Sequence, residues 1–139
     1  MAVFISAADP LPFVAWDPGA PGFHLQALSE VEAPVRARLR HPHVYFLGAH
    51  TGCSCGFNYG LRDVNRPEDR AEDLASEASV RSLRAYLEAA VAAQGEVDVL
   101  ATWDNDWARE PRQVHVTPAW FGGATFEMPE HTRFRVTRD

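Results

Sequence analysis

The sequence predicts a single α+β domain over residues 1–139, in which a mixed sheet of about five strands packs on one main helix. Three observations lead to this prediction. Apolar residues recur with helical spacing through residues 77–94, several short β-branched and aromatic segments flank that stretch, and no repeat or linker divides the chain. A length of 139 residues is also usual for one domain.

The N-terminal third predicts a strand, a loop and a short helix. Residues 2–6 are apolar and typical of a strand, whereas residues 9–22 hold four prolines and two glycines and indicate a loop. Within residues 24–39, apolar side chains recur every three or four positions, as on one face of a helix, but Pro34 interrupts it. Ser29 and Glu32 have the spacing of a capping box. We therefore expect a short or broken N-terminal helix.

The strand over residues 44–49 and the helix over residues 77–94 form the predicted centre of the fold. Successive apolar residues over 44–49 favour a strand in the middle of the sheet. The acidic stretch 58–75 predicts either a helix that begins at Pro67 or an exposed loop. Because residues 97–103 indicate another strand, we expect the helix to lie in a crossover connection between two strands.

The C-terminal part predicts a turn and two further strands. Residues 104–106 are typical of a turn, and Val114 and Val116 flank His115 in a short strand. Pro118 indicates the start of a single helical turn. Residues 133–137 alternate between polar and apolar, which predicts a half-buried strand at an edge of the sheet.

Composition excludes several classes of protein. The net charge of −6 argues against a protein that binds nucleic acid, because phosphate binding needs clustered lysines and arginines. No segment is long and apolar enough for a membrane span, and the first residues do not resemble a secretory signal. We therefore expect a cytoplasmic protein, whose two cysteines are thiols, metal ligands or a redox pair rather than a structural disulfide.

The most distinctive segment is the glycine-rich stretch of residues 50–57, which follows the central strand and reads His-Thr-Gly-Cys-Ser-Cys-Gly-Phe. It holds both cysteines of the protein, Cys53 and Cys55, together with His50. Thiolate and imidazole are the ligands that zinc prefers, and glycine lets the backbone turn tightly around an ion. The leading hypothesis is that this loop binds zinc or another thiophilic metal through His50, Cys53 and Cys55. His115 is the predicted fourth ligand, with His41, His43 and Asp104 as other candidates.

Three alternatives remain open at this point. The cysteines could be chemically active, either as a thiolate activated by backbone N–H groups or as a pair that cycles between dithiol and disulfide. They could instead be small buried apolar residues beside an ordinary turn. Finally, the acidic charge, the 58–75 stretch and the aromatic segment 103–121 favour a protein that acts by binding another protein through its surface.

Overall fold

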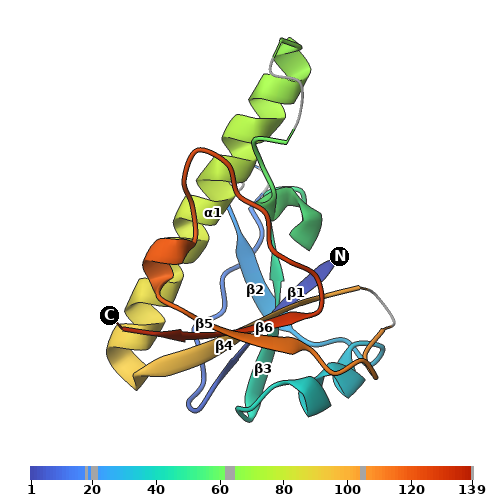
Figure 1. The fold of residues 1–139 in the computed structure, drawn as a ribbon, viewed down its shortest axis with the longest axis vertical. Coiled ribbons are helices and arrows are strands. Elements are labelled where there is room, and N and C mark those ends of the chain that lie inside the picture. Colours follow the sequence, from blue (N-terminus) through green and yellow to red (C-terminus); the bar gives the residue numbers. More distant parts are fainter. Residues whose placement is uncertain (18, 20–21, 62–64, 104–105, 139) are drawn as a thin grey trace.

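The computed structural model describes residues 1–17, 19, 22–61, 65–103 and 106–138, and it confirms the α+β fold (Figure 1). One mixed sheet packs against one long helix. In chain order the described elements are β1 (Ala2–Ala7), β2 (His24–Ala27), the 3₁₀ helix η1 (Ala33–Arg38), β3 (His43–Gly48), the 3₁₀ helix η2 (Ser54–Phe57), α1 (Pro67–Gln94), β4 (Glu96–Thr102), β5 (Arg112–Val116), the 3₁₀ helix η3 (Pro118–Trp120) and β6 (Thr132–Thr137).

The sheet has six strands in the order β2-β3-β1-β4-β6-β5, one more than predicted. All neighbours are antiparallel except β5 and β6, which are parallel. As predicted, β3 lies inside the sheet, and α1 connects it with β4. Since both strands are antiparallel to β1, which lies between them, β3 and β4 run in the same direction. The expected edge position of the last strand is wrong, because β5 pairs with β6 on its outer side.

The segment 24–39 differs from its predicted helix. Residues His24–Ala27 pair with β3 as an edge strand, so that Leu25 is buried beside Leu47. The apolar spacing suits a helix, but pairing with β3 satisfies the backbone and buries the same leucine. Only the part after the predicted capping box is helical, as the 3₁₀ turn η1. The box itself is confirmed: the Ser29 N–H donates to Glu32 Oε1 at 2.8 Å, and the Glu32 N–H to Ser29 Oγ at 3.3 Å.

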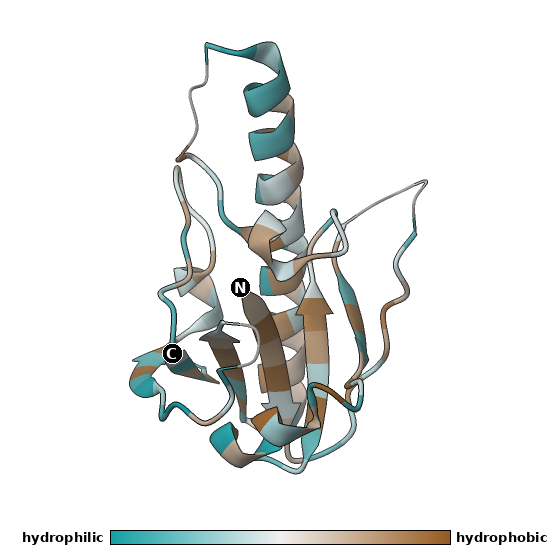
Figure 2. Ribbon diagram, turned by 90° about the vertical axis from the view of Figure 1, so that its right-hand side faces the viewer, coloured by the Kyte–Doolittle hydropathy of each residue, from teal (hydrophilic) through white to brown (hydrophobic). Residues whose placement is uncertain are grey.

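Helix α1 starts at Pro67 and is therefore longer than the predicted span 77–94. Proline suits a first helical position, and Glu68 and Asp69 in the first turn favour the helix dipole. Gly95 ends the helix with a φ of 91°. The buried side chains of α1 begin at Ser76, and its N-terminal part extends beyond the sheet in both ribbon views (Figures 1 and 2).

The two faces of the sheet are covered unequally. The face toward α1 buries most of the core, including Val3, Leu47 and Phe134 of the sheet against Leu83 and Leu87 of the helix. We call the other side the open face. It carries a second, smaller cluster that η1 helps to cover, made up of Ala2, Phe4, Val35, Leu39, Val44 and Leu100.

Tyr86 ties the N-terminal loop to α1. Its hydroxyl donates to the Pro12 carbonyl at 2.6 Å, and burial raises its pKa to about 12. We expect Tyr86→Phe to lower the free energy of unfolding at pH 7 by about 1 kcal/mol. Because the folded pKa is raised, the contribution of the tyrosine is fully present below pH ~10 and is lost as pH rises toward 12. Urea unfolding of both proteins at pH 7 and pH 11 should therefore show a smaller difference at pH 11, and an unchanged difference would contradict this assignment.

Candidate functional site

The glycine-rich stretch of residues 50–57, which we call the cysteine loop, follows β3 as predicted. Ser54 attaches this loop to the sheet. Ser54 lies between the two cysteines and is fully buried. Its hydroxyl accepts the Val3 N–H at 2.9 Å and donates to the Leu47 carbonyl. The turn is thus held to two neighbouring strands, β1 and β3, by a single side chain.

Two glycines let the chain fold tightly around this anchor. Gly52 has a φ of 84° and donates its N–H to the Ala49 carbonyl at 2.9 Å, which closes a turn at the end of β3. Gly56 packs so closely that a Cβ atom there would lie 2.8 Å from the Ala49 Cβ and 2.9 Å from Thr51 Oγ1. The glycine-rich composition therefore has a steric cause at both positions.

Both thiols are exposed, so the interpretation of the cysteines as buried apolar residues is wrong. The Cys55 N–H donates to Cys53 Sγ at 3.3 Å, and this contact caps η2. Partial burial, and then the neighbouring Cys53 side chain, raise the pKa of Cys55, while the charge of the Met1 amino group acts in the opposite direction. Cys53 and Cys55 are therefore two free, exposed cysteines on one short turn.

The raised pKa of Cys55 predicts slow alkylation. At pH 7 to 8 a smaller fraction of Cys55 is thiolate than in an unfolded peptide of the same sequence, so iodoacetamide should label it more slowly. Labelling should accelerate at more alkaline pH than for an ordinary cysteine, because the pKa of Cys55 is raised. Peptide mass spectrometry of timed reactions, with the denatured chain as control, measures both rates. Faster labelling of Cys55 in the folded protein would contradict the assignment.

The His50 side chain turns toward α1, and both of its nitrogens have partners. Nδ1 lies 3.0 Å from Ser79 Oγ and Nε2 lies 2.9 Å from Glu72 Oε1. Glu72 and Ser79 are seven residues apart, which places them on the same face of the helix. The His50 N–H also donates to Ser79 Oγ, at 3.0 Å. His50 therefore fastens the loop to the helix.

Serine, histidine and glutamate together resemble a hydrolytic triad in composition, but their arrangement does not suit nucleophilic catalysis. Ser79 is fully buried, and its hydroxyl donates to the Gly22 carbonyl at 2.7 Å. A nucleophilic hydroxyl must reach a substrate and give its proton to the histidine. We therefore assign these three residues to structure rather than to chemistry.

The other predicted ligands lie away from the loop. His115 is on the edge strand β5, four strand spacings or roughly 19 Å from β3, and its Nε2 contacts Thr137 Oγ1 at 2.6 Å. His41 and His43 precede or begin β3, at the end opposite His50. Asp104 lies outside the described residues. Within the part of the chain that the structure describes, no three histidine, cysteine or acidic side chains are grouped closely enough to hold a metal ion.

The segments predicted to bind another protein, 58–75 and 103–121, are partly buried in the core. Phe121 is fully buried, and Trp120 packs on it and on Phe126 and Phe134. Leu61 and Leu74 remain exposed in the stretch 58–75. Whether another protein binds there stays a prediction.

None of the helices in the described residues is long and apolar enough to cross a membrane. Comparison with known proteins adds no relative to this description: no family model, no curated protein and no solved structure matches the chain.

Proposed function

We propose that the Cys53–Cys55 turn is a dithiol site that binds a thiophilic metal ion, such as zinc, through its two sulfur atoms. The observation that supports the proposal is the pair itself: two exposed cysteines, free of a disulfide, on one short turn in which the Cys55 N–H donates to Cys53 Sγ at 3.3 Å. Ser54 holds that turn to the sheet, so the backbone that carries both cysteines is fixed before an ion binds. Preorganisation of this kind favours binding.

The sulfur ligands of this site favour some metal ions over others. Zinc in proteins takes four ligands, so two thiolates would leave two positions for water or for another molecule. His50 could join only after it leaves Ser79 and Glu72. A softer ion such as Cu(I) is also favoured by sulfur ligands. The proposal therefore describes an open, exchangeable site rather than a closed structural zinc site.

A cadmium and zinc titration of the reduced protein under anaerobic conditions tests the proposal. We expect one equivalent of Cd²⁺ to produce thiolate-to-metal charge-transfer absorption, and Zn²⁺ to compete for the same site. Cys53→Ser and Cys55→Ser should each abolish stoichiometric binding. Affinity should rise with pH, because binding displaces the thiol protons.

Histidine variants serve as matched controls. His115→Gln should bind like the unchanged protein, because His115 lies on the far edge of the sheet. His50→Gln shows whether His50 is a ligand. The metal affinity is retained if the two sulfur atoms bind the ion without it, and falls if His50 joins the site. Absence of stoichiometric metal in the reduced protein, or binding by either serine variant that equals that of the unchanged protein, would overturn the proposal.

The separation of the two free cysteines by a single residue also supports a second candidate, thiol–disulfide exchange. In this reaction the Cys53 thiolate attacks a low-molecular-weight disulfide and displaces one thiolate, and Cys55 then attacks the Cys53 sulfur and releases the second. The protein gives up two electrons and two protons in total. Equilibration with glutathione buffers, read as loss of alkylatable thiols, tests this reaction. A pair that stays reduced in oxidised glutathione would exclude it.

A further inference from the structure

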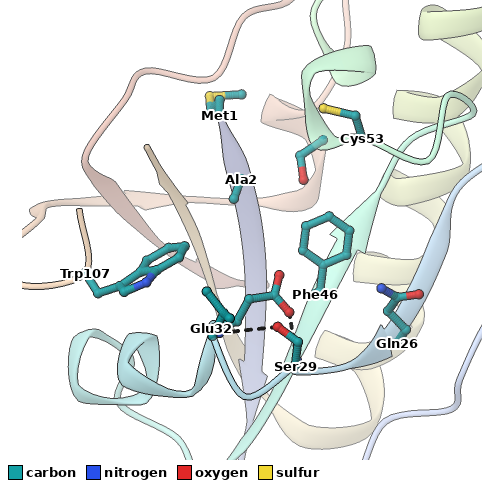
Figure 3. A pocket seen from close by; sticks show the side chains of 10 residues that line it. Met1, Ala2, Gln26, Ser29, Glu32, Phe46, Cys53 and Trp107 are labelled. Carbon is teal, nitrogen blue, oxygen red and sulfur yellow. Dashed lines mark hydrogen bonds between the residues drawn. The ribbon is translucent and has the colours of Figure 1, made fainter. Parts of the chain in front are cut away.

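A groove on the open face of the sheet lies beside the cysteine loop. It is an open hollow of about 560 Å³, which is within the usual range for sites that bind small molecules. Its walls come from the turn before η1, from β2 and β3, and from Trp107. The close-up in Figure 3 shows the Glu32 carboxylate pointing between Trp107 and Phe46, with the sulfur atoms of Met1 and Cys53 at the opposite end.

Glu32 gives this groove a negative charge that no nearby side chain cancels. One carboxylate oxygen accepts the Ser29 N–H at 2.8 Å in the capping box. Among the described residues none forms an ion pair with Glu32, and neither an arginine nor a histidine side chain lines the groove. The charged amino group at the groove belongs to Met1, at the end opposite Glu32, and Arg38, whose Nε donates to the Trp107 carbonyl at 2.9 Å, pairs with Glu110 at 2.8 Å. With a net charge of −6 on the protein, the groove favours a positively charged occupant.

Two aromatic rings flank this carboxylate, and one buried ring holds both in position. Trp107 and Phe46 each pack edge-to-face on Phe4, with ring centroids 5.5 and 5.9 Å from it. Phe4 is fully buried in the middle of the open face, so its position is fixed by β1. Aromatic rings attract cations through their π-electrons, and alkylated ammonium groups are common ligands of such rings.

We infer that this groove binds a small organic cation of the alkylammonium class, with Glu32 as the counter-charge and Trp107 and Phe46 as the aromatic walls. A bare inorganic cation fits less well, because a single carboxylate supplies too few oxygen ligands. The inference does not depend on the proposed metal site, which uses the sulfur atoms at the other end of the groove.

Binding of choline and of its neutral isostere, 3,3-dimethylbutan-1-ol, tests this inference. Amide and indole chemical shifts of the ¹⁵N-labelled protein, recorded during each titration, give the affinity and locate the site. We expect choline to shift the signals of Glu32, Gln26 and the Trp107 indole, and to bind about five- to tenfold more tightly than the alcohol. Equal affinities, or shifts confined to another surface, would overturn the inference.

Two variants separate charge and aromaticity from folding. In Glu32→Gln the amide oxygen can still accept the Ser29 N–H, so the capping box persists while the charge is lost. We expect this change and Trp107→Leu each to weaken choline binding about fivefold or more. Trp103→Leu is the matched control, because Trp103 is exposed, bonds to Glu130 and does not line the groove. If the control weakens binding as much as Trp107→Leu does, the inference fails. Binding should persist in the double variant Cys53→Ser/Cys55→Ser, which distinguishes this site from the metal site.

Discussion

Replacing Ser54 by alanine is expected to lower the free energy of unfolding by about 2–4 kcal/mol. The change removes the hydroxyl that accepts the Val3 N–H and donates to the Leu47 carbonyl. Ser54 is fully buried, so water cannot replace it without opening the packing between the cysteine loop and the sheet. Two backbone groups would remain without partners, and each carries a desolvation cost. Urea unfolding followed by circular dichroism measures the difference.

Ser76 provides a matched control for this change. It is as deeply buried as Ser54, but its hydroxyl has no hydrogen-bond partner among the described residues. Removing an unsatisfied buried hydroxyl relieves a cost instead of creating one, so Ser76→Ala should leave stability unchanged or raise it by up to about 1 kcal/mol. A similar loss in both variants would show that burial alone, and not the two hydrogen bonds, sets the contribution of Ser54.

A larger loss, of about 3–5 kcal/mol, is expected for Arg40→Met. Asp98 on β4 is fully buried, and its carboxylate accepts from the Arg40 backbone N–H at 3.3 Å and from Nε at 2.9 Å. These bonds to Asp98 also raise the pKa of Arg40. Methionine keeps much of the length and apolar stem of the side chain but leaves the buried carboxylate without its cation. Denaturant unfolding at neutral pH measures the loss.

Two further variants show where the loss comes from. Arg84→Met removes an exposed helical pair, in which Arg84 Nε lies 3.0 Å from Glu88 Oε1, and should change stability by no more than about 0.5 kcal/mol. Adding Asp98→Asn to Arg40→Met removes the stranded charge and should restore much of the lost stability. If Arg40→Met lowers the free energy of unfolding no more than Arg84→Met does, the buried Asp98 carboxylate does not depend on Arg40, and the assignment is refuted.

Local sequence patterns correctly predicted those helices and strands in which the spacing of apolar residues matches the secondary structure. The helix over 77–94 and the strand over 44–49 are of this kind, because their apolar positions match the face that is buried. Leu25 was misassigned, because spacing of three and four residues also fits an edge strand followed by a turn. The position of β6 depended on a parallel pairing with β5, which no local pattern encodes.

At the candidate site, the sequence indicated the residues that are neighbours along the chain. Cys53 and Cys55 lie together, as adjacency requires. The partners of His50, which are Ser79 and Glu72, come from the helix, where polar residues at a spacing of seven are normally solvated and give no signal. Glu32 was identified only as a capping residue, because its place between two aromatic rings arises from the packing of η1 on the open face.

The projecting end of α1 has a consequence for local stability. Residues 67–75 bury no side chain, whereas a regular series of buried positions starts at Ser76. Backbone amides that lack such support exchange with solvent through local fraying, without unfolding of the domain. Deuterium uptake should therefore be rapid from the Pro67 end and fall steeply near Ser76. The bond between Glu72 and His50 lies inside the fraying turns, so fraying breaks this bond, while Ser79, in the supported part of the helix, keeps its two contacts with His50.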